Sequence, residues 1–392
     1  MSTLKVNKIE ATGTTDGGIE IDSDGHVQID GVHWPTAGPL SNRNLIINGA
    51  MQVAQRGTSF TASGYGVDRW QTQFPASVGI THTQETLSSG DPYNEGFRYF
   101  MRADVTTAST ASDRWTQFTT RLEAQTLAQS GWKYTDTNSY ITISFWARSS
   151  LSGTYYLVLR ASDAASYTYP KSFTLEGDTW KKITCSIPGN SNLVFDNDAL
   201  SGLEILVKPD YGPDFTGSEA TDNAWYNRTT QNWVPDYSQN WLATVDNTFD
   251  LTGVQLEVGD KATPFEHRIF GDELSRCQRY YSKSYSYQDA PGTNTSDSLQ
   301  GLRNWDASDR SDVPANVRFP VEMRAAPTVT IYTRDGSSGN LSESSNGFTH
   351  GSSKAISSVR SLGRAGYNTL ACSVNVGGLQ FYIWHWTASA EL

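Results

Sequence analysis

Short runs in which apolar and polar residues alternate recur along this chain of 392 residues. In residues 254–258, Val254, Leu256 and Val258 alternate with Gln255 and Glu257, and residues 140–147, YITISFWA, are the clearest run. A period of two residues is typical of a β-strand with one buried face. Further strand candidates are residues 115–122, 155–159, 171–175, 180–185, 203–207 and 249–258. Their spacing, with turn residues between them, predicts an all-β chain in which residues 41–270 form a jelly-roll β-sandwich.

Changes in composition divide the rest of the chain. A short polar helix is expected at 273–281, within a junction segment at 271–281 that leads to a β-rich C-terminal domain at 282–392. Strand candidates in that domain are residues 317–321, 328–332, 367–376 and 379–386. Within the sandwich, residues 210–247 form a long polar loop rich in aromatic residues, and loops of that length are usually functional or disordered.

Residues 1–40 are too polar to fold alone, but they contain a hairpin signal. Ile19 and Ile21 precede the turn-forming sequence DSDG at 22–25, and Val27 and Ile29 follow it. A hairpin of this size is marginal by itself, and identical copies packed around an axis would stabilise it. DSDG could instead be part of a calcium loop, but it lacks the distal Glu and the other ligands of an EF-hand. Pro35, Gly38 and Pro39 mark a linker to the sandwich.

Charge and hydropathy limit the class of partner. The net charge is −11, and the whole excess lies in residues 1–270, with 30 acidic and 19 basic residues, whereas 271–392 hold 11 of each. Nucleic acids and anionic membranes require a basic surface, so neither is expected as a partner. No run approaches the roughly 18 apolar residues that a membrane span needs, so membrane insertion is not expected.

Cysteine usage and the N-terminus indicate synthesis in a cytoplasm. Cys185, Cys277 and Cys372 are widely separated and include no C-x-x-C pair, so neither a zinc site nor a disulfide framework is expected. The first residues, MSTLKVNKIEATG, lack the apolar core of a signal peptide.

Five motifs resemble a known family. They are NLIINGAMQVAQRGTSF (44–60), GVDRW (66–70), ISFWAR (143–148), GVQLEVGDKATPFEHR (253–268) and ELSRCQRYY (273–281). Together they resemble bacteriophage tail fibre proteins that contain a jelly-roll domain similar to carbohydrate-binding modules. The N-terminal STLKVNKI and GGIEI are less specifically similar to tail attachment segments of such fibres.

The resemblance implies a homotrimeric virion protein. Residues 1–40 would attach it to an adaptor or nozzle protein of the phage tail, and residues 282–392 would contact a host receptor or surface glycan. No catalytic residues accompany these motifs in the family, so none are assigned here. The resemblance also makes a structural calcium ion conceivable, with Asp68, Asp250 and Glu257 as oxygen donors.

Aromatic residues are the candidate glycan contacts, because sugar rings stack on flat aromatic faces while amides and carboxylates bind the hydroxyl groups. The residues predicted to bind carbohydrate are Trp225, Tyr226, Trp233, Tyr237, Trp241, Tyr382, Trp384 and Trp386. For Trp233 and Trp241 the alternative is packing beneath the long loop. For Tyr382, Trp384 and Trp386 it is a place in the core or at a trimer axis. Trp70 and Trp146 are expected in the core, and Tyr280 and Tyr281, on the junction helix, are expected to pack between the three chains of a trimer or between domains.

Catalytic signatures are missing from the sequence. There is no H-E-x-x-H, G-x-S-x-G or G-x-x-x-x-G-K-[ST] motif, and no pair among the 41 acidic residues stands out as a glycosidase pair. We therefore expect a non-enzymatic adhesion protein with no cofactor. A glycan-degrading tailspike is the alternative, although the β-helix repeats usual in such enzymes are not seen. A third hypothesis, a free carbohydrate-binding module of a secreted enzyme, is disfavoured by the lack of a signal peptide and a catalytic domain.

Overall fold

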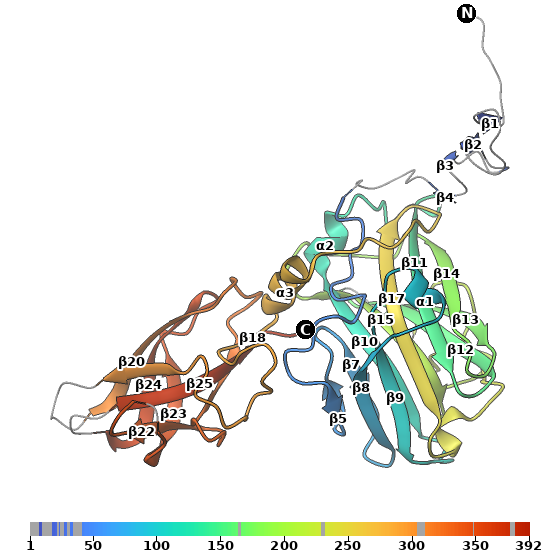
Figure 1. The fold of residues 1–392 in the computed structure, drawn as a ribbon. Helices are drawn as coiled ribbons and strands as arrows, with labels where there is room; N and C mark the ends of the chain where they lie inside the picture. The colour runs from blue at the N-terminus through green and yellow to red at the C-terminus, as the bar shows by residue number, and fades with distance from the viewer. Residues whose placement is uncertain are drawn as a thin grey trace, which may run out of the picture. The chain divides into compact units, whose positions relative to one another are not determined.

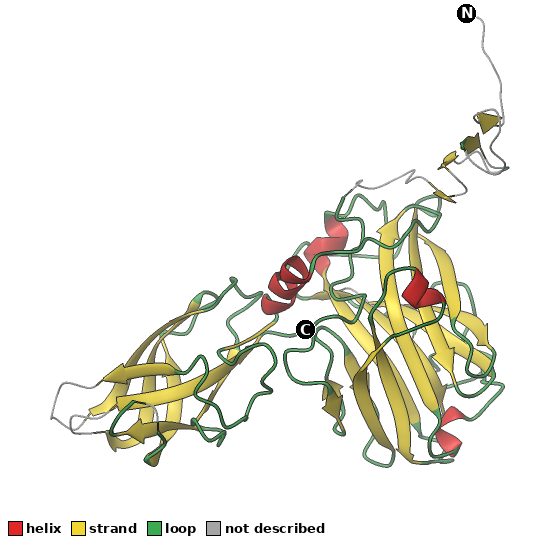
Figure 2. Cartoon of the chain, in the orientation of Figure 1, coloured by secondary structure: helices red, strands yellow, loops and turns green. Residues whose placement is uncertain are grey.

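The computed structural model describes residues 8–9, 18–21, 23, 27–29, 32–33, 41–163, 166–228, 232–303, 310–347, 349–376 and 381–392. Strands are the main regular secondary structure of this part of the chain, and its helices are few and short, which confirms the predicted all-β class (Figures 1 and 2). The chain divides into two compact units. The first comprises residues 1–51, 61–63 and 71–268, and the second comprises 52–60, 64–70 and 269–392.

Two antiparallel sheets form the sandwich of the first unit. One runs β14–β11–β17–β9–β8 and the other runs β16–β13–β12–β15–β10–β7. Phe118 and Tyr155 of the second sheet meet Phe249 of the first at ring-centroid distances of 5.8 and 5.3 Å, so the core lies between the sheets. The strands are β7 (Gln71–Gln73), β8 (Gly79–Thr86), β9 (Tyr99–Thr107), β10 (Trp115–Glu123), β11 (Tyr140–Ser149), β12 (Gly153–Ala161), β13 (Tyr167–Leu175), β14 (Lys181–Pro188), β15 (Ser201–Tyr211), β16 (Tyr226–Asn227) and β17 (Thr248–Val258). Short helical segments are α1 (Asp91–Asn94), α2 (Ala124–Ala128) and η1 (Trp241–Ala243).

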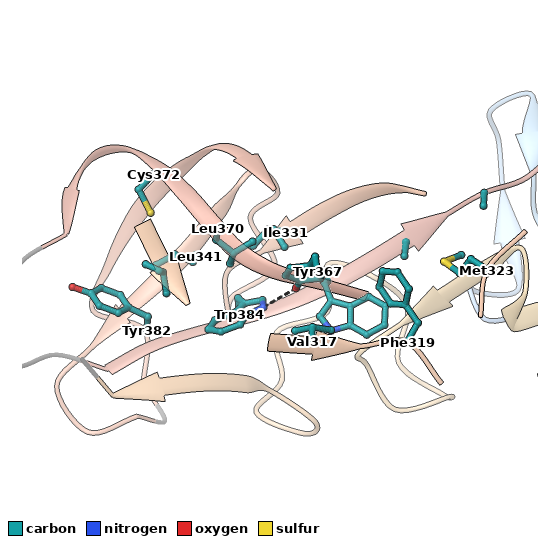
Figure 3. Packing of buried hydrophobic residues seen from close by; sticks show 14 residues of the cluster. Val317, Phe319, Met323, Ile331, Leu341, Tyr367, Leu370, Cys372, Tyr382 and Trp384 are labelled. Atoms are coloured by element: carbon teal, nitrogen blue, oxygen red, sulfur yellow. Dashed lines mark hydrogen bonds between the residues drawn. The ribbon is translucent and has the colours of Figure 1, made fainter. Parts of the chain in front are cut away.

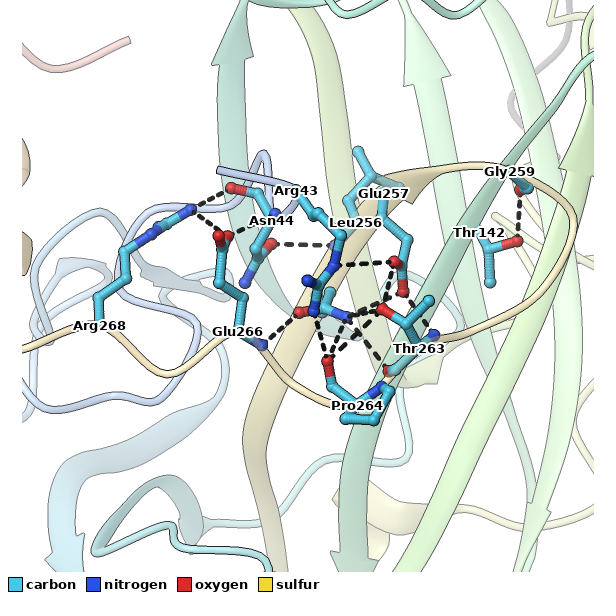
Figure 4. Close-up of polar contacts among 11 residues, drawn as sticks. Arg43, Asn44, Thr142, Leu256, Glu257, Gly259, Thr263, Pro264, Glu266 and Arg268 are labelled. Carbon is cyan, nitrogen blue, oxygen red and sulfur yellow. Dashed lines mark hydrogen bonds and ion pairs between the residues drawn. The ribbon is translucent and has the colours of Figure 1, made fainter. Parts of the chain in front are cut away.

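The first and last segments of the sandwich bind each other (Figure 4). The backbone N–H of Leu45 donates to the carbonyl of Leu256 at 2.8 Å, and the Asn44 side chain donates to the Val254 carbonyl at 3.1 Å. A side chain at Gly49 would place its Cβ 2.0 Å from the Val254 carbonyl oxygen, so only glycine allows this approach. The motifs at 44–60 and 253–268 therefore contact each other, and we call this contact between the first and last segments of the sandwich the closure.

The same closure fixes the turn that follows β17. The Glu257 carboxylate accepts bonds from the backbone N–H and the hydroxyl of Thr263 at 2.9 and 2.6 Å, and the Arg268 guanidinium donates to the Ile46 carbonyl at 2.9 Å. Glu257 and Thr263 are buried and satisfy each other, which is the condition for burying polar groups at low cost (Figure 4).

The N-terminal hairpin is confirmed as part of a small antiparallel sheet in the order β1–β2–β3–β4. Its strands are β1 (Lys8–Ile9), β2 (Ile19–Ile21), β3 (Val27–Ile29) and β4 (Val32–His33). Ile19 lies opposite Ile29, and Ile21 lies opposite Val27. The predicted turn at 22–25, except for Ser23, and the linker at Pro35, Gly38 and Pro39 lie outside the described residues.

A second β-core follows the short helix α3 (Phe270–Gln278), which is the predicted junction helix. The sheet runs β18–β25–β22–β23–β24–β20, and β19 and β21 also pair with β25. Trp384 on β25 donates its indole N–H to the Tyr367 hydroxyl at 3.0 Å inside this core (Figure 3). The strands are β18 (Tyr281–Lys283), β19 (Gln300–Arg303), β20 (Arg310–Arg318), β21 (Thr328–Tyr332), β22 (Asn340–Ser344), β23 (Ser352–Arg360), β24 (Gly366–Val376) and β25 (Phe381–Ser389). The short strands β5 (Ser59–Phe60) and β6 (Gly64–Tyr65) also belong to the second unit.

A buried charge cluster, which we call the C-terminal clamp, completes the second unit. It consists of Arg56, Asp68, Arg69 and Glu391. Glu391 binds Arg56 at 3.0 Å and also binds Arg69, while Arg56 lies 3.5 Å from Asp68.

Two tyrosines cover the cations of the C-terminal clamp. The Arg69 guanidinium lies 3.5 Å from the ring centroid of Tyr280, and that of Arg56 lies 3.6 Å from the centroid of Tyr281. The motifs at 44–60, 66–70 and 273–281 thus converge on one cluster. Both tyrosines are buried by contacts within the chain, and the trimer or interdomain packing predicted for them stays a prediction.

Candidate functional site

One sheet of the sandwich carries a set of polar side chains on the side that faces away from the core, beside an apolar group of Tyr156, Val158 and Leu206. Phe118 on β10 points into the core, so the residues that alternate with it point outward. The strand register places the outward residues of β7, β10, β15 and β12 beside one another. We call this set the polar face; its members are Gln71, Gln73, Gln117, Thr119, Arg121, Arg160, Glu204 and Lys208.

Glu204 is the centre of one half of the polar face. It lies opposite Arg121 on one neighbouring strand and opposite Arg160 on the other. Arg121 donates to one carboxylate oxygen at 2.7 Å, and Arg160 donates to the other at 2.9 Å. Arg121 also donates to the Gln71 side-chain oxygen at 2.8 Å, so β7, β10, β15 and β12 are cross-linked. Charge-assisted bonds of this kind hold the guanidinium planes in fixed orientations.

Amide side chains organise the other half. The Gln73 oxygen accepts from the Gln117 amide at 2.6 Å and from the Thr119 hydroxyl at 3.1 Å. The Gln117 oxygen in turn accepts from the Lys208 ammonium group at 2.6 Å and from the Tyr211 hydroxyl. Gln117, Thr119, Lys208 and Tyr211 are buried, so this network holds the half-buried Gln73 in a fixed orientation.

An aromatic row borders the polar face. Tyr211 contacts Trp115, Phe215 and Trp233 edge to face, at centroid distances of 6.0, 5.7 and 6.4 Å. Trp115, Phe215 and Trp233 are half-buried, whereas Tyr211 is buried. The row therefore offers partly accessible aromatic carbon next to amide and guanidinium groups.

Cations gather at Trp233. The Arg228 guanidinium lies 3.8 Å from the Trp233 ring centroid, the Lys208 ammonium group lies 4.3 Å from it, and the Arg160 guanidinium lies 5.7 Å from it. Burial lowers the pKa of Lys208 well below its ordinary value, and the nearby Arg228 and Arg160 lower it further against the opposing effect of Glu204.

The predicted aromatic residues of the long loop do not form one group. Trp233 and Tyr237 cover the outer face of β12 and β15, where they contact Tyr156, Val158 and Leu206. Tyr226 joins Trp233 through a hydrogen bond from its hydroxyl to the Trp233 carbonyl at 3.0 Å. Trp225 instead donates to the Pro188 carbonyl at 2.7 Å and contacts Tyr169.

The remaining predicted aromatic residues are in the core. Trp241, Tyr382, Trp384 and Trp386 are all buried, so in this structure they offer no ring face to a ligand. Their burial supports the alternative stated with the prediction, namely that these four residues are packing residues. Trp70 and Trp146 are also buried, as expected.

Sequence reasoning missed most of the polar face. Its residues come from strands that lie far apart in the chain, and only their pairing brings them together. The alternation in residues 115–122 places Trp115, Gln117, Thr119 and Arg121 on one side of a strand, and this was the available signal. The sequence does not show which neighbours that side would meet.

The suggested calcium donors are engaged elsewhere. Asp68 is bound by Gln55 and lies beside Arg56, Asp250 is bound by Arg102 and Arg148, and Glu257 is bound by Thr263. Within the described ranges, no three His, Cys, Asp or Glu side chains gather as a metal site would require. None of the helices in that part of the chain is long and apolar enough to cross a membrane.

Comparisons with known proteins give weak structural likenesses. No family model and no curated protein matches this sequence. The enzymatically active domain of tailspike protein 4 of bacteriophage CBA120 is 11% identical, with a TM-score of 0.30, over 55% of this chain and 22% of that chain. This chain therefore spans about a fifth of that tailspike domain.

Two other solved structures are covered almost completely. A family 11 carbohydrate-binding module from Clostridium thermocellum is 12% identical over 54% of this chain and 99% of the module, with a TM-score of 0.25. A cyclase from Fischerella sp. TAU is 10% identical over 57% of this chain and 98% of the cyclase, with a TM-score of 0.31. Likenesses at this level assign no function, so the function of this chain has to be inferred from its own side chains.

Proposed function

We propose that this protein is a non-catalytic adhesion protein of a bacteriophage tail fibre and that it binds a host-surface glycan through the polar face. The observation that carries glycan binding is the aromatic row of Trp115, Tyr211, Phe215 and Trp233 beside an ordered set of amide and guanidinium groups. Sugars present apolar C–H faces and directional hydroxyl groups, and this combination of side chains complements both.

A glycan chain would lie across the strands of the polar face. Gln71, Gln73 and Arg121, which are half-buried, would bind its hydroxyl groups, and the half-buried rings of Trp115 and Trp233 would contact its apolar faces. Each such contact is weak, and several identical sites on one particle would multiply them into firm attachment.

Replacing Trp233 by Ala is expected to weaken binding of the full chain to host-surface polysaccharide about tenfold, which corresponds to about 1.4 kcal/mol. The reason is loss of the ring that closes one end of the aromatic row. Affinity electrophoresis in gels that contain the polysaccharide measures the change.

Trp180→Ala is the matched control for this measurement. Trp180 is also half-buried and also lies beneath an arginine, since the Arg148 guanidinium is 4.8 Å from its ring centroid, but it belongs to the opposite side of the sandwich. Equal effects of the two substitutions, or no effect of Trp233→Ala, would contradict a site on the polar face.

The tail fibre part of the proposal is supported by the five sequence motifs and by the N-terminal sheet. Ile9, Ile19 and Ile29 lie in register across three strands, and Ile21 and Val27 extend the same face. Their exposed fractions range from 36% for Val27 to 60% for Ile9. The opposite face carries Lys8, Glu20 and Gln28. An uncovered apolar face on so small a sheet favours association with identical copies, which fits a homotrimer that docks on a tail protein through residues 1–40 in the virion.

Light scattering of the full chain is therefore expected to give three times the 43.2 kDa mass of one chain. Replacing Ile19 and Ile29 together by Asn should make this trimer dissociate at higher protein concentrations than the unaltered trimer does, because the pair lies at the centre of the apolar face. Replacing Glu20 and Gln28, the neighbouring pair on the polar side, is the control. A monomeric unaltered chain would rule out the trimer.

The non-catalytic part of the proposal has its own test. A glycosidase places two carboxylates about 5–10 Å apart across the sugar. Both oxygens of Glu204 are already bound by arginines, so it is poorly suited to act as a free acid or base. Incubation with host polysaccharide should release no reducing ends, and their release would establish the depolymerase alternative instead.

A further inference from the structure

We infer that the glycan bound by the polar face carries acetyl groups, and that their carbonyl oxygens accept hydrogen bonds from the side-chain N–H groups of Gln71, Gln73 and Trp115. This inference rests on the proposed glycan-binding function and adds the chemical class of the ligand. Its basis is the division of the polar face into oxygens that are already engaged and N–H groups that are not.

The side-chain oxygens of the polar face accept bonds from neighbouring residues. The Gln71 oxygen accepts from the Arg121 guanidinium at 2.8 Å. The Gln73 oxygen accepts from the Gln117 amide at 2.6 Å and from the Thr119 hydroxyl at 3.1 Å. A ligand group that has to donate a proton therefore finds these acceptors already in use.

The same bonds fix which end of each amide faces outward. Because an arginine can only donate, Gln71 turns its oxygen toward Arg121 and its nitrogen away. Gln117 turns its oxygen toward Lys208 and its nitrogen toward Gln73, which receives that nitrogen with its own oxygen. Within the described residues, the amide nitrogens of Gln71 and Gln73 have no partner, and neither nitrogen is buried. Both glutamines therefore present N–H groups to solvent.

The indole N–H groups of Trp115 and Trp233 are presented in the same way. In the part of the chain that the structure describes, neither indole nitrogen has a hydrogen-bond partner, and neither is buried. Trp115 lies close to Gln73, because Gln117 is directly opposite Gln73 and Trp115 is two residues further along the same side of β10. An amide donor, an indole donor and a partly accessible ring are thus neighbours.

An acetyl group complements this surface better than a hydroxyl group does. A hydroxyl oxygen can accept from an amide, but its proton then needs an acceptor, and the oxygens of Gln71 and Gln73 are engaged. A carbonyl oxygen accepts and has no proton to place. The methyl group next to it can lie on the half-buried ring of Trp115. N-acetyl and O-acetyl groups of sugars both present this combination.

The charge around these donors favours a neutral ligand group. The two carboxylate oxygens of Glu204 already bind Arg121 and Arg160, and the amide and indole donors are neutral. Residues 1–270 hold 30 acidic and 19 basic residues, so a ligand carboxylate would approach a protein of its own sign.

The test uses an array of bacterial surface polysaccharides with acetylated and unacetylated members. Each acetylated member is also present after removal of its O-acetyl groups, after removal of its N-acetyl groups, and after chemical reacetylation. The full chain is expected to bind acetylated members, to lose at least tenfold in affinity on one of the two deacetylations, and to regain it on reacetylation. The deacetylation that weakens binding identifies the N-acetyl or the O-acetyl source. Binding should change little with salt concentration, because the contacts are neutral.

Gln73→Glu tests one donor directly. It replaces the amide nitrogen by oxygen and keeps the oxygen that accepts from Gln117 and Thr119, so it should weaken binding of acetylated members about tenfold. Gln288→Glu adds the same charge at an exposed position of the second unit and is the control. Trp115→Phe removes the indole N–H but keeps an aromatic ring, and it should weaken the same binding while the urea midpoint of unfolding stays unchanged.

The outcomes separate the two proposals. Equal binding of acetylated and deacetylated polysaccharides, with continued dependence on Trp233, would overturn the acetyl specificity and leave glycan binding at the polar face intact. Unchanged affinity of both Gln73→Glu and Trp115→Phe would overturn the assignment of the donors. Binding to no member of the array, or binding that ignores Trp233, would overturn glycan binding at this face and the acetyl specificity with it.

Discussion

Replacing Glu391 by Ala is expected to lower the free energy of unfolding of the second unit by about 3–5 kcal/mol, because removal of one partner leaves buried charges without compensation. The side chains of Glu391 and Arg69 are only 7% and 2% exposed, and Arg56 binds the same carboxylate at 3.0 Å. Loss of the carboxylate would leave two buried guanidinium groups with Asp68 as their remaining acidic neighbour in the C-terminal clamp.

Urea unfolding of the full chain, followed by hydrogen exchange of peptides from the second unit, measures this effect. Glu322→Ala is the matched control in the same unit. Glu322 binds Arg364 at 3.1 Å, but both side chains are about half exposed or more, at 62% and 48%. An exposed pair of this kind contributes about 0–1 kcal/mol. Similar effects of the two substitutions would show that the C-terminal clamp does not stabilise the second unit.

The fold class could be predicted because its signal is local. The alternation in residues 140–147 corresponds to β11, and that in residues 254–258 corresponds to the end of β17. The hairpin of Ile19, Ile21, Val27 and Ile29 forms with the apolar residues directly opposite one another. In each case a few consecutive residues indicate the strand but not which side is buried, because both faces of β11 and of β17 are buried and the apolar side chains of the hairpin are exposed.

The sequence motifs have a physical basis that their letters do not reveal. The motif at 44–60 begins with residues that bind the Val254 and Leu256 backbone, and it continues through Arg56 into the C-terminal clamp. Tyr280 and Tyr281 of the last motif cover the arginines of that clamp. The motif residues described here take part in packing and in buried charge contacts. The motifs therefore indicate the fold, and they do not identify a ligand.

The polar face could not be predicted because its formation is non-local. Glu204 meets Arg121 and Arg160 only because β15 pairs with both β10 and β12. Strand order and register depend on the whole hydrophobic pattern, and no short segment specifies them. The aromatic composition of the long loop pointed to both Trp233, which is half-buried, and Trp241, which is buried, and it could not distinguish the two positions.

Trp241 shows that distinction most clearly. The ring has no exposed surface, and its indole N–H donates to the Thr248 carbonyl at 3.1 Å. The next residue, Leu242, donates its backbone N–H to the buried Asp210 carboxylate at 2.8 Å. Together these contacts fasten the end of the long loop to the sandwich.

Trp241→Ala is accordingly expected to lower the free energy of unfolding of the first unit by about 3–5 kcal/mol, the usual cost of deleting a fully buried aromatic side chain. Trp225→Ala in the same loop is the matched control. Its ring is half-buried and makes one hydrogen bond, to the Pro188 carbonyl, so its removal should cost less than half as much. Urea unfolding followed by hydrogen exchange of first-unit peptides compares the two. A small loss of stability for Trp241→Ala, together with a large loss of glycan binding, would instead place Trp241 at a binding surface and contradict its position in the core.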